Sequence, residues 1–376
     1  MFLNIFRQTQ RRFSQFRSAD WLIVLSAFVL LLFGLAAIYS VDLSRGGELI
    51  NMKKQLLALF IALSVAFFIA TSNYKLLRNY TLVFYTTGIV LLTSVLFFGT
   101  TVRGARGWFV FTHASLQPVE FMKFALIITL TTYFSQRARS NFGFKELLES
   151  MGLTAIPVVL TLLQPDLGSA SVLVGIWGCL ALFAGMRSRF VLLLGALGAG
   201  VFGLAWRFFF ADYQKSRILT LFSPENDPLG QGYNVAQAVI AIGAGGWFGR
   251  GLGFGSQSQL KFLPESHTDF IFAVIAEELG FVGVLLLFGA FSILFLRLAT
   301  LMRQSHDSFT AFLLAGIGSV LFLQILVNVG MNLGLFPVTG IGLPLVSYGG
   351  SSLILFVVLL GVVQSVAIHS RRSSES

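Results

Sequence analysis

Acidic residues are scarce in this chain, and several of them lie together just before and inside one long apolar run. The segment FLPESHTDFIFAVIAEELGFVG, residues 262–283, contains Glu265, His267, Asp269, Glu277 and Glu278, whereas the whole chain has 16 Asp and Glu residues. Carboxylates and imidazoles are side chains that often accept and donate protons in enzymes. This segment is therefore the first candidate for acid–base chemistry.

Asp269 stands at the start of the apolar run and has two interpretations. On a helix that begins at Asp269, the small residues Ala273, Ala276, Gly280 and Gly283 share its face. Such a stripe lets another helix approach closely, or it leaves a groove beside a carboxylate at the membrane surface. Asp is also a favoured N-cap residue, so helix capping alone stays an alternative.

The other polar residues of the segment also have structural interpretations. Glu277 and Glu278 lie deeper in the apolar run, where a hydrogen bond or ion pair that fixes helix packing is favoured over chemistry. His267 is as consistent with a hydrogen bond inside a loop as with substrate binding. A lone histidine without an HExxH motif or a nearby cysteine is weak support for a metal site.

A second polar cluster lies in TVRGARGWFVFTHASLQPVEFMKF, residues 101–124. Glu120 and Lys123 are spaced i, i+3, which allows an ion pair on one helix face, although such a pair is more often structural. Lys123 lies near the loop residues Arg103 and Arg106, and these cations could neutralise a diphosphate. Trp108 is interpreted as an anchor at the membrane interface, with packing against a lipid or sugar as the alternative.

Two turns carry further polar residues. QPDLG, residues 164–168, contains Gln164, and a Pro-Asp turn explains it without any function. PLVSYGGSS, residues 344–352, contains Ser347 and is consistent with a re-entrant segment before the last apolar run. Either turn could line a cavity.

Membrane-spanning helices must position these clusters. The chain is 56% hydrophobic and 11% charged, whereas typical soluble proteins have about 25% charged residues. Apolar runs of about the length needed to cross a bilayer predict an all-α, polytopic membrane protein with about ten transmembrane helices. The predicted spans are 21–41, 55–72, 81–99, 119–135, 151–163, 169–186, 190–210, 270–298, 309–333 and 352–369.

The placement of Lys and Arg predicts the orientation. With the N-terminus inside, the inner segments hold fifteen of these residues and the short outer loops hold five, so both termini are predicted to be cytoplasmic. The predicted organisation is a basic segment 1–20, one membrane domain 21–370 and a tail 371–376, with an outer loop 211–269 between the seventh and eighth spans. The net charge of +10 reflects topology and attraction to anionic membrane lipids, and it does not support nucleic-acid binding.

The outer loop 211–269 is too long for a simple connection. Its segment VAQAVIAIG predicts an amphipathic helix lying against the membrane. Its GAGGWFGRGLGFG run gives no GxGxxG frame and no GK[ST], so tight backbone turns are favoured over nucleotide binding. Cys179 is the only cysteine, which excludes a disulfide framework and a thiolate metal site.

Several of these motifs resemble one family of membrane proteins. LPESHTDFIFAVIAEELGFVG, SPENDPLGQGYNVAQAVIAIGAGG, QPVEFMK, QPDLGSA and PLVSYGGSS occur together among ten predicted spans. In this combination they resemble the SEDS family (shape, elongation, division and sporulation) over nearly the whole chain. DYQKSRI, SPENDPLGQGY and GSQSQLKFLPE are more similar to its RodA branch, which maintains rod shape, than to its FtsW branch, which acts in division.

The resemblance implies a function for the chain. It implies a peptidoglycan glycosyltransferase that polymerises lipid II on the outer face of the bacterial inner membrane, with a class B penicillin-binding protein as its transpeptidase partner. It also implies that Asp269 is the catalytic residue, and a carboxylate there suits the base that an inverting transfer to a 4-hydroxyl requires. The resemblance further implies undecaprenyl diphosphate as the leaving group, so no soluble nucleotide is expected.

The same chemistry assigns candidate roles to the polar clusters. Lys123, with Arg103 or Arg106, would neutralise the leaving diphosphate, and a divalent cation such as Mg²⁺ or Mn²⁺ could share this role. Glu120 would orient Lys123, and Trp108 matches a family position linked to activity. The candidate substrate-binding residues are Lys123, Glu120, Trp108, Arg103, Arg106, His267, Glu265, Gln164 and Ser347.

The chain departs from the family pattern at three positions, and other functions stay open. Val119 stands where relatives often carry a small polar residue, Lys261 where they often carry an acidic one, and Ser115 where some carry a basic one. The alternatives are an FtsW-type septal polymerase, a lipid II flippase and a non-catalytic scaffold for a transpeptidase. A flippase needs a polar path through both leaflets, which the concentration of ionisable residues in the outer half disfavours.

Overall fold

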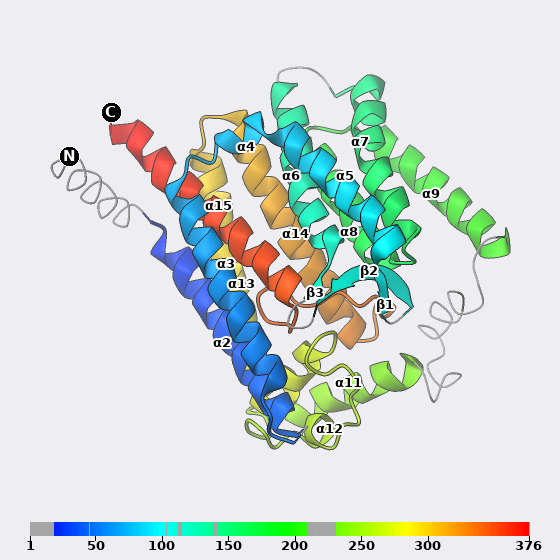
Figure 1. Ribbon diagram of the computed structural model, residues 1–376, viewed down its shortest axis with the longest axis vertical. Coiled ribbons are helices and arrows are strands. Elements are labelled where there is room, and N and C mark those ends of the chain that lie inside the picture. The colour runs from blue at the N-terminus through cyan, green and yellow to red at the C-terminus, as the bar shows by residue number, and fades with distance from the viewer. Residues whose placement is uncertain are drawn as a thin grey trace.

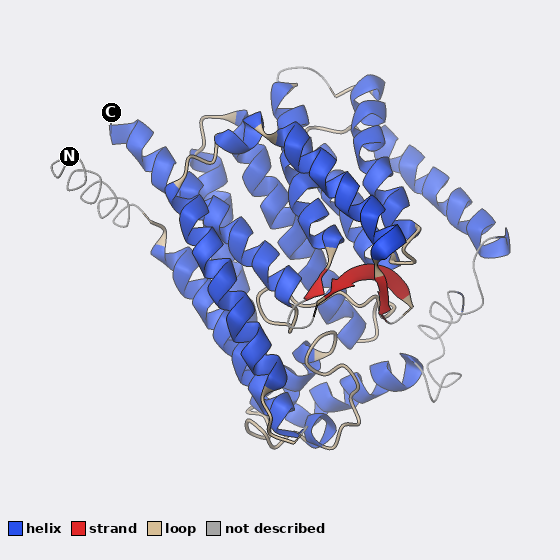
Figure 2. Ribbon diagram, viewed as in Figure 1, coloured by secondary structure: helices blue, strands red, loops and turns tan. Residues whose placement is uncertain are grey.

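Long helices account for the ten predicted spans. The computed structural model describes residues 19–375 apart from 45, 103, 112–114, 138–141, 209–214 and 216–230. Figure 1 shows the long helices side by side in one bundle, and Figure 2 shows how little of the described chain is not helical. They are α2 (Trp21–Ser44), α3 (Ile50–Thr71), α5 (Thr81–Phe98), α6 (Pro118–Gln136), α7 (Phe144–Leu162), α8 (Leu167–Phe183), α9 (Ser188–Phe208), α13 (Ile271–Gln304), α14 (Ser308–Asn332) and α15 (Gly350–Glu375).

The chain is a multi-pass membrane protein. Among the described residues, seven helices are long and apolar enough to cross a bilayer, namely α2, α3, α5, α9, α13, α14 and α15. Helix α8 is a shorter apolar helix, and α6 and α7 carry charged residues within 19 residues each. The prediction of an all-α polytopic protein with about ten transmembrane helices is confirmed.

Several helices extend beyond the predicted apolar runs into polar sequence. Helix α7 begins at Phe144 rather than near 151, and α15 continues to Glu375, through most of the predicted tail. At the start of α7 the backbone N–H of Gly143 donates to the Glu146 carboxylate at 2.9 Å, which closes the first turn. Apolar runs report the part of a helix that lies in hydrocarbon, so they miss polar turns at its ends.

The smaller elements gather at one end of the bundle. They are the antiparallel strands β1 (Thr100–Val102), β2 (Ala105–Val110) and β3 (Ser115–Leu116), with the helices α11 (Gln231–Gly245) and α12 (Ser256–Gln259). The start of α2 and the end of α15 lie at the opposite end (Figure 1). The predicted loop helix is confirmed as α11, whereas the three short strands were not predicted. The short helix α4 (Leu76–Asn79) connects α3 to α5.

Helix α13 is broken at Gly280, which corrects the expectation of one continuous helix over 270–298. Gly280 has φ 65° and ψ −166°, a conformation that is essentially restricted to glycine. A Cβ at this position would clash with the backbone of Phe248 and Gly249. The small-residue stripe therefore does let another element approach closely, but Gly283 lies beyond the break and does not continue the face.

The glycine-rich segment 245–251 supplies the backbone partners that the broken helix needs. Its amides at 250 and 251 donate to the carbonyls of Glu277 and Glu278 at 3.0 and 2.9 Å. Its carbonyls at 246 and 247 accept from the amides of Phe281 and Val282 at 2.9 and 3.0 Å. Glycines 246, 249, 251 and 253 all have positive φ, which confirms the prediction of tight turns.

Candidate active site

Asp269 lies in a buried turn that leads into α13. Its side chain is buried, and the helix begins two residues later at Ile271. The N-cap position falls on Phe270 rather than Asp269. The structure thus places the carboxylate just outside the helix, in the turn itself, rather than at the N-cap position.

Two asparagines of α14 hold the Asp269 turn. The side-chain amides of Asn328 and Asn332 each donate to the Asp269 carbonyl at 3.0 Å. The Asn332 carboxamide oxygen also accepts from the backbone N–H of Ala273 at 3.2 Å, and Asn328 donates to the Ile341 carbonyl at 2.8 Å. Both asparagines are fully buried. Sequence analysis missed them, although two amides spaced i, i+4 inside an apolar span are a visible signal.

The segment between α14 and α15 packs against the same turn. The Ser347 hydroxyl donates to the Thr268 carbonyl at 2.6 Å, and the Tyr348 amide donates to the His267 carbonyl at 2.9 Å. The rings of His267 and Tyr348 lie 5.3 Å apart. Burial, with a smaller contribution from the Asp42 carboxylate, raises the pKa of the Tyr348 phenol, which therefore stays neutral at physiological pH. The predicted site residues His267 and Ser347 thus both border Asp269.

The segment that contains Ser347 also reaches the second polar cluster. The Ser351 hydroxyl donates to the Ser115 carbonyl at 3.0 Å and accepts from the Gln117 amide at 3.1 Å. These bonds tie the start of α15 to β3 and to the start of α6. Two clusters that are more than a hundred residues apart in the sequence are therefore linked through one segment.

The predicted ion pair on α6 is present. The Lys123 ammonium lies 2.8 Å from the Glu120 carboxylate, and both side chains are buried. Glu120 lies in the first turn of α6, where the helix dipole favours a negative charge. Its second oxygen, Oε2, has no hydrogen-bond partner among the described residues. The pair therefore retains one acceptor that no described residue uses.

Arg106 connects α5 to the turn after α7. Its guanidinium donates to the carbonyls of Phe97 and Gly99 at 2.9 and 3.0 Å, which satisfies the C-terminal end of α5. Its backbone N–H donates to the Gln164 carbonyl at 3.2 Å, and the Gln164 carboxamide donates to the Leu92 carbonyl at 3.2 Å. Arg106 and Gln164 are thus close to one another, and both have structural contacts.

The remaining candidate substrate-binding residues are Trp108, Glu265 and Arg103. Trp108 lies in β2 opposite Thr100 and is half-buried. Glu265 has φ 53°, and its carbonyl accepts from the Thr268 amide at 3.0 Å, so it shapes the turn before Asp269. Arg103 lies outside the described residues.

Glu277 and Glu278 fix packing, as expected. Glu277 accepts from the amides of Gln257 and Ser258 at 2.8 and 3.1 Å and so anchors the start of α12. Glu278 accepts from the hydroxyl of Ser40 on α2 and from that of Ser258 at 3.4 Å. The two carboxylates therefore join α13 to the outer loop and to α2.

The described residues offer no dedicated metal site. Among them no group of three or more His, Cys, Asp and Glu side chains could hold an ion. A divalent cation therefore has no ready-made set of protein ligands in this part of the chain.

Comparisons with known proteins agree on one family. The family model for FtsW, RodA and SpoVE, described as cell cycle protein, matches residues 20–372. Peptidoglycan glycosyltransferase MrdB of Escherichia coli is 40% identical over 77% of this chain and 78% of its own length. Stage V sporulation protein E of Bacillus subtilis is 36% identical over 94% of this chain and 98% of its own length.

Solved structures show the same architecture. The crystal structure of Thermus thermophilus RodA superposes with a TM-score of 0.70 at 30% identity, covering 93% of this chain and 96% of that one. A chain from a peptidoglycan synthase complex, solved to describe the coordination of polymerization and crosslinking, superposes with a TM-score of 0.79 at 33% identity. That match covers 95% of this chain and 99% of the other.

Proposed function

Because this chain belongs to the FtsW/RodA/SpoVE family and is a peptidoglycan glycosyltransferase of cell-wall synthesis, we propose that it polymerises lipid II with Asp269 as the general base. The observation that carries this proposal is the Asp269 turn. It places a buried carboxylate in a loop that two other segments hold by hydrogen bonds. Such fixed placement is what a base that must meet a substrate hydroxyl requires.

The proposed step is an inverting transfer. Asp269 accepts the proton of the acceptor 4-hydroxyl while that oxygen attacks the anomeric carbon of the donor sugar. The bond from that carbon to the diphosphate breaks, and undecaprenyl diphosphate leaves with the electron pair. A new β-1,4 bond replaces the α bond to the diphosphate. The configuration at the anomeric carbon is therefore inverted once.

We assign stabilisation of the leaving diphosphate to the α6 pair and Arg106. Lys123 is a positive charge held by Glu120 in a buried position, where solvent screens its field weakly. Arg106 is exposed and uses only part of its five-donor guanidinium on carbonyls, so its other N–H groups can bind phosphate oxygens. A divalent cation such as Mg²⁺ or Mn²⁺, carried by the diphosphate itself, would add to this stabilisation.

We place the protein in the bacterial inner membrane with Asp269 at the outer face. The excess of Lys and Arg in the predicted inner segments supports this orientation. The elements around Asp269 lie at the end of the bundle away from the start of α2 and the end of α15 (Figure 1). The two deep carboxylates bond outer-loop residues rather than lining a path, which supports a polymerase over a flippase.

We infer a role in cell elongation, with septal synthesis of the FtsW type as the alternative. The identity to MrdB and the superposition on RodA support the first role. A class B penicillin-binding protein is the proposed partner, because a chain of similar fold comes from a complex in which polymerization and crosslinking are coordinated.

The test is polymerisation of labelled lipid II by purified protein, with and without its transpeptidase partner. Asp269→Asn keeps the shape of the side chain but removes its basicity, so glycan synthesis should fall at least about a hundredfold. Glu48→Gln changes an exposed carboxylate at the same end of the bundle and should leave the rate unchanged. If Asp269→Asn polymerises at the wild-type rate, the assignment of the general base is wrong.

A further inference from the structure

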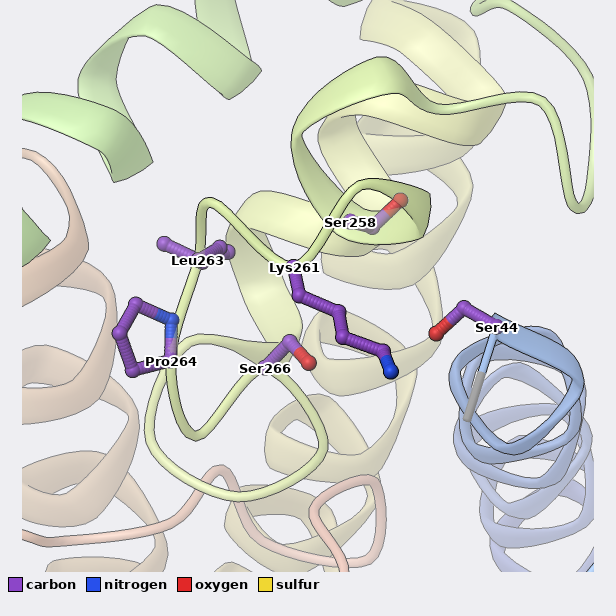
Figure 3. Close-up of a pocket in the computed structure, with 6 residues that line it drawn as sticks. All are labelled: Ser44, Ser258, Lys261, Leu263, Pro264 and Ser266. Carbon is purple, nitrogen blue, oxygen red and sulfur yellow. The ribbon is translucent and has the colours of Figure 1, made fainter. Parts of the chain in front are cut away.

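A polar pocket lies beside the loop that leads to Asp269. It has a volume of about 280 Å³ and is lined by Ser44, Ser258, Lys261, Leu263, Pro264 and Ser266. Figure 3 shows the Lys261 side chain crossing the pocket toward Ser44 at the end of α2. The pocket therefore lies between α2 and the segment that connects α12 to α13.

Two hydrogen-bond donors in this pocket have no partner among the described residues. Lys261 is exposed, and none of the ion pairs in the described part of the chain involves it. Ser266 is only 2% exposed, and its hydroxyl forms no hydrogen bond with any described residue. A buried hydroxyl that lines a pocket without a partner is available to a ligand.

The other hydroxyls of the pocket already donate elsewhere. Ser44 donates to the Val41 carbonyl at 2.7 Å, and the Ser258 hydroxyl shares its proton between the Gly255 carbonyl at 3.2 Å and the Glu278 carboxylate at 3.4 Å. Among the described residues, no Asp or Glu side chain lines the pocket. The Lys261 ammonium and the Ser266 hydroxyl are therefore the donors that this pocket offers to a ligand. Both favour an oxyanion as that ligand.

The backbone at Lys261 is held in an unusual conformation. Its φ is 62°, in the left-handed region that favours glycine. Such conformations in non-glycine residues cluster at ligand-binding and active sites. Here the conformation carries the lysine side chain across the pocket rather than away from it (Figure 3).

The pocket is close to the proposed catalytic carboxylate. Ser266 precedes Asp269 by three residues, and three residues of chain span at most about 11 Å. A ligand group in the pocket and a sugar at Asp269 can therefore belong to one substrate molecule.

We propose that Lys261 and Ser266 form an oxyanion-binding site that holds a charged group of lipid II while Asp269 acts on its sugar. This inference rests on the proposed polymerisation of lipid II. The bound oxyanion is either a carboxylate of the peptide stem or a phosphate of the diphosphate. The experiment below distinguishes these two groups.

The primary test is steady-state polymerisation by Lys261→Gln. Loss of one charge-assisted hydrogen bond should raise KM for lipid II about tenfold, with kcat within about twofold of wild type. Lys261→Glu should raise KM further, and Ser266→Ala should raise it about fivefold. Lys54→Gln removes an exposed charge near the start of α3 and should leave KM unchanged. Wild-type KM values in both Lys261 variants would overturn the inference.

Lipid II with amidated peptide carboxylates identifies the group that is bound. If the Lys261→Gln penalty disappears with this substrate, the pocket binds a peptide carboxylate. If the penalty persists, the pocket binds a phosphate.

A binding measurement keeps the two proposals distinct. The full-length protein in detergent is titrated with inorganic pyrophosphate and with an acetylated dipeptide that has a free carboxylate. If wild type does not polymerise but binds either probe in a Lys261-dependent way, the polymerase proposal fails and the pocket stands. If wild type does not polymerise and neither probe binds through Lys261, both proposals fail.

Discussion

At the residue scale, the position of Asp269 depends on two buried amides rather than on its own helix. Asn332 uses both ends of its carboxamide, because it donates to the Asp269 carbonyl and accepts from the Ala273 amide. Replacing it with an apolar residue leaves the buried Ala273 amide unpaired and removes one of the two donors to the Asp269 carbonyl, so the turn is held less firmly. Asn332 is therefore a positioning residue that acts through Asp269.

We expect Asn332→Ala to lower kcat for lipid II polymerisation at least about tenfold and to change KM less, because a small displacement of a catalytic group is costly. Gln324→Leu is the matched control. Gln324 is buried on the same helix, and its Nε2 has no hydrogen-bond partner among the described residues, so its loss should leave kcat unchanged. Equal effects on kcat and stability in both variants would mean that Asn332 has only a general packing role.

At the element scale, the break in α13 makes the outer loop and the helix one structural unit. The amides and carbonyls that the break frees are paired with residues 246–251 rather than with water or lipid. Unpaired groups at this depth would each cost several kcal/mol. Gly245 and Gly249 have no room for a Cβ, because the α13 backbone at residues 276–279 lies directly against them.

We expect Gly280→Ala to destabilise the folded protein by about 3 kcal/mol or more, since alanine strains at this φ and ψ and its Cβ meets the 248–249 backbone. Gly243→Ala, in α11, has open space around the added Cβ. It should instead stabilise the protein by up to about 1 kcal/mol. Thermal unfolding in detergent measures both. A wild-type Tm for Gly280→Ala would show that the break is not needed.

The sequence predicts the existence of each span because hydrocarbon imposes a length and a composition on any helix. Span 169–186 corresponds to Leu167–Phe183, for example. The break at Gly280 is hidden because an isolated glycine in an apolar run is equally compatible with an intact helix. Its cause lies about thirty residues upstream, in backbone pairing that no local pattern reveals. Strands β1 and β3 are too short to give a period-2 pattern, and the sequence of β2, ARGWFV, does not alternate between apolar and polar residues.

At the scale of the whole molecule, the candidate site is assembled from several segments. Sequence analysis identifies each segment but does not show which of them are in contact. Asp269, His267 and Ser347 meet as expected of a shared site. Asn328 and Asn332 were missed because their importance follows from what they contact. Arg106 was predicted to bind phosphate, and its bonds to the end of α5 show a structural role that only the fold reveals.

We expect the two ends of the bundle to face opposite sides of the membrane. Cys179 is the only cysteine, so Cys179→Ser gives a cysteine-free background. In that background a membrane-impermeant maleimide should label Glu48→Cys, between α2 and α3, in intact cells. It should label His306→Cys, between α13 and α14, only after permeabilisation; both sites are exposed. The reverse pattern would invert the proposed topology.

The pairing at Gly280 also has a consequence for the order of synthesis. A chain is made from its N-terminus, so residues 246–251 leave the ribosome before residues 277–282. The partners of the groups freed at the break therefore already exist when that helix emerges, and no later part of the chain is needed to pair them. A discontinuous helix that would otherwise be a poor candidate for insertion into a bilayer is thus completed by a segment that precedes it.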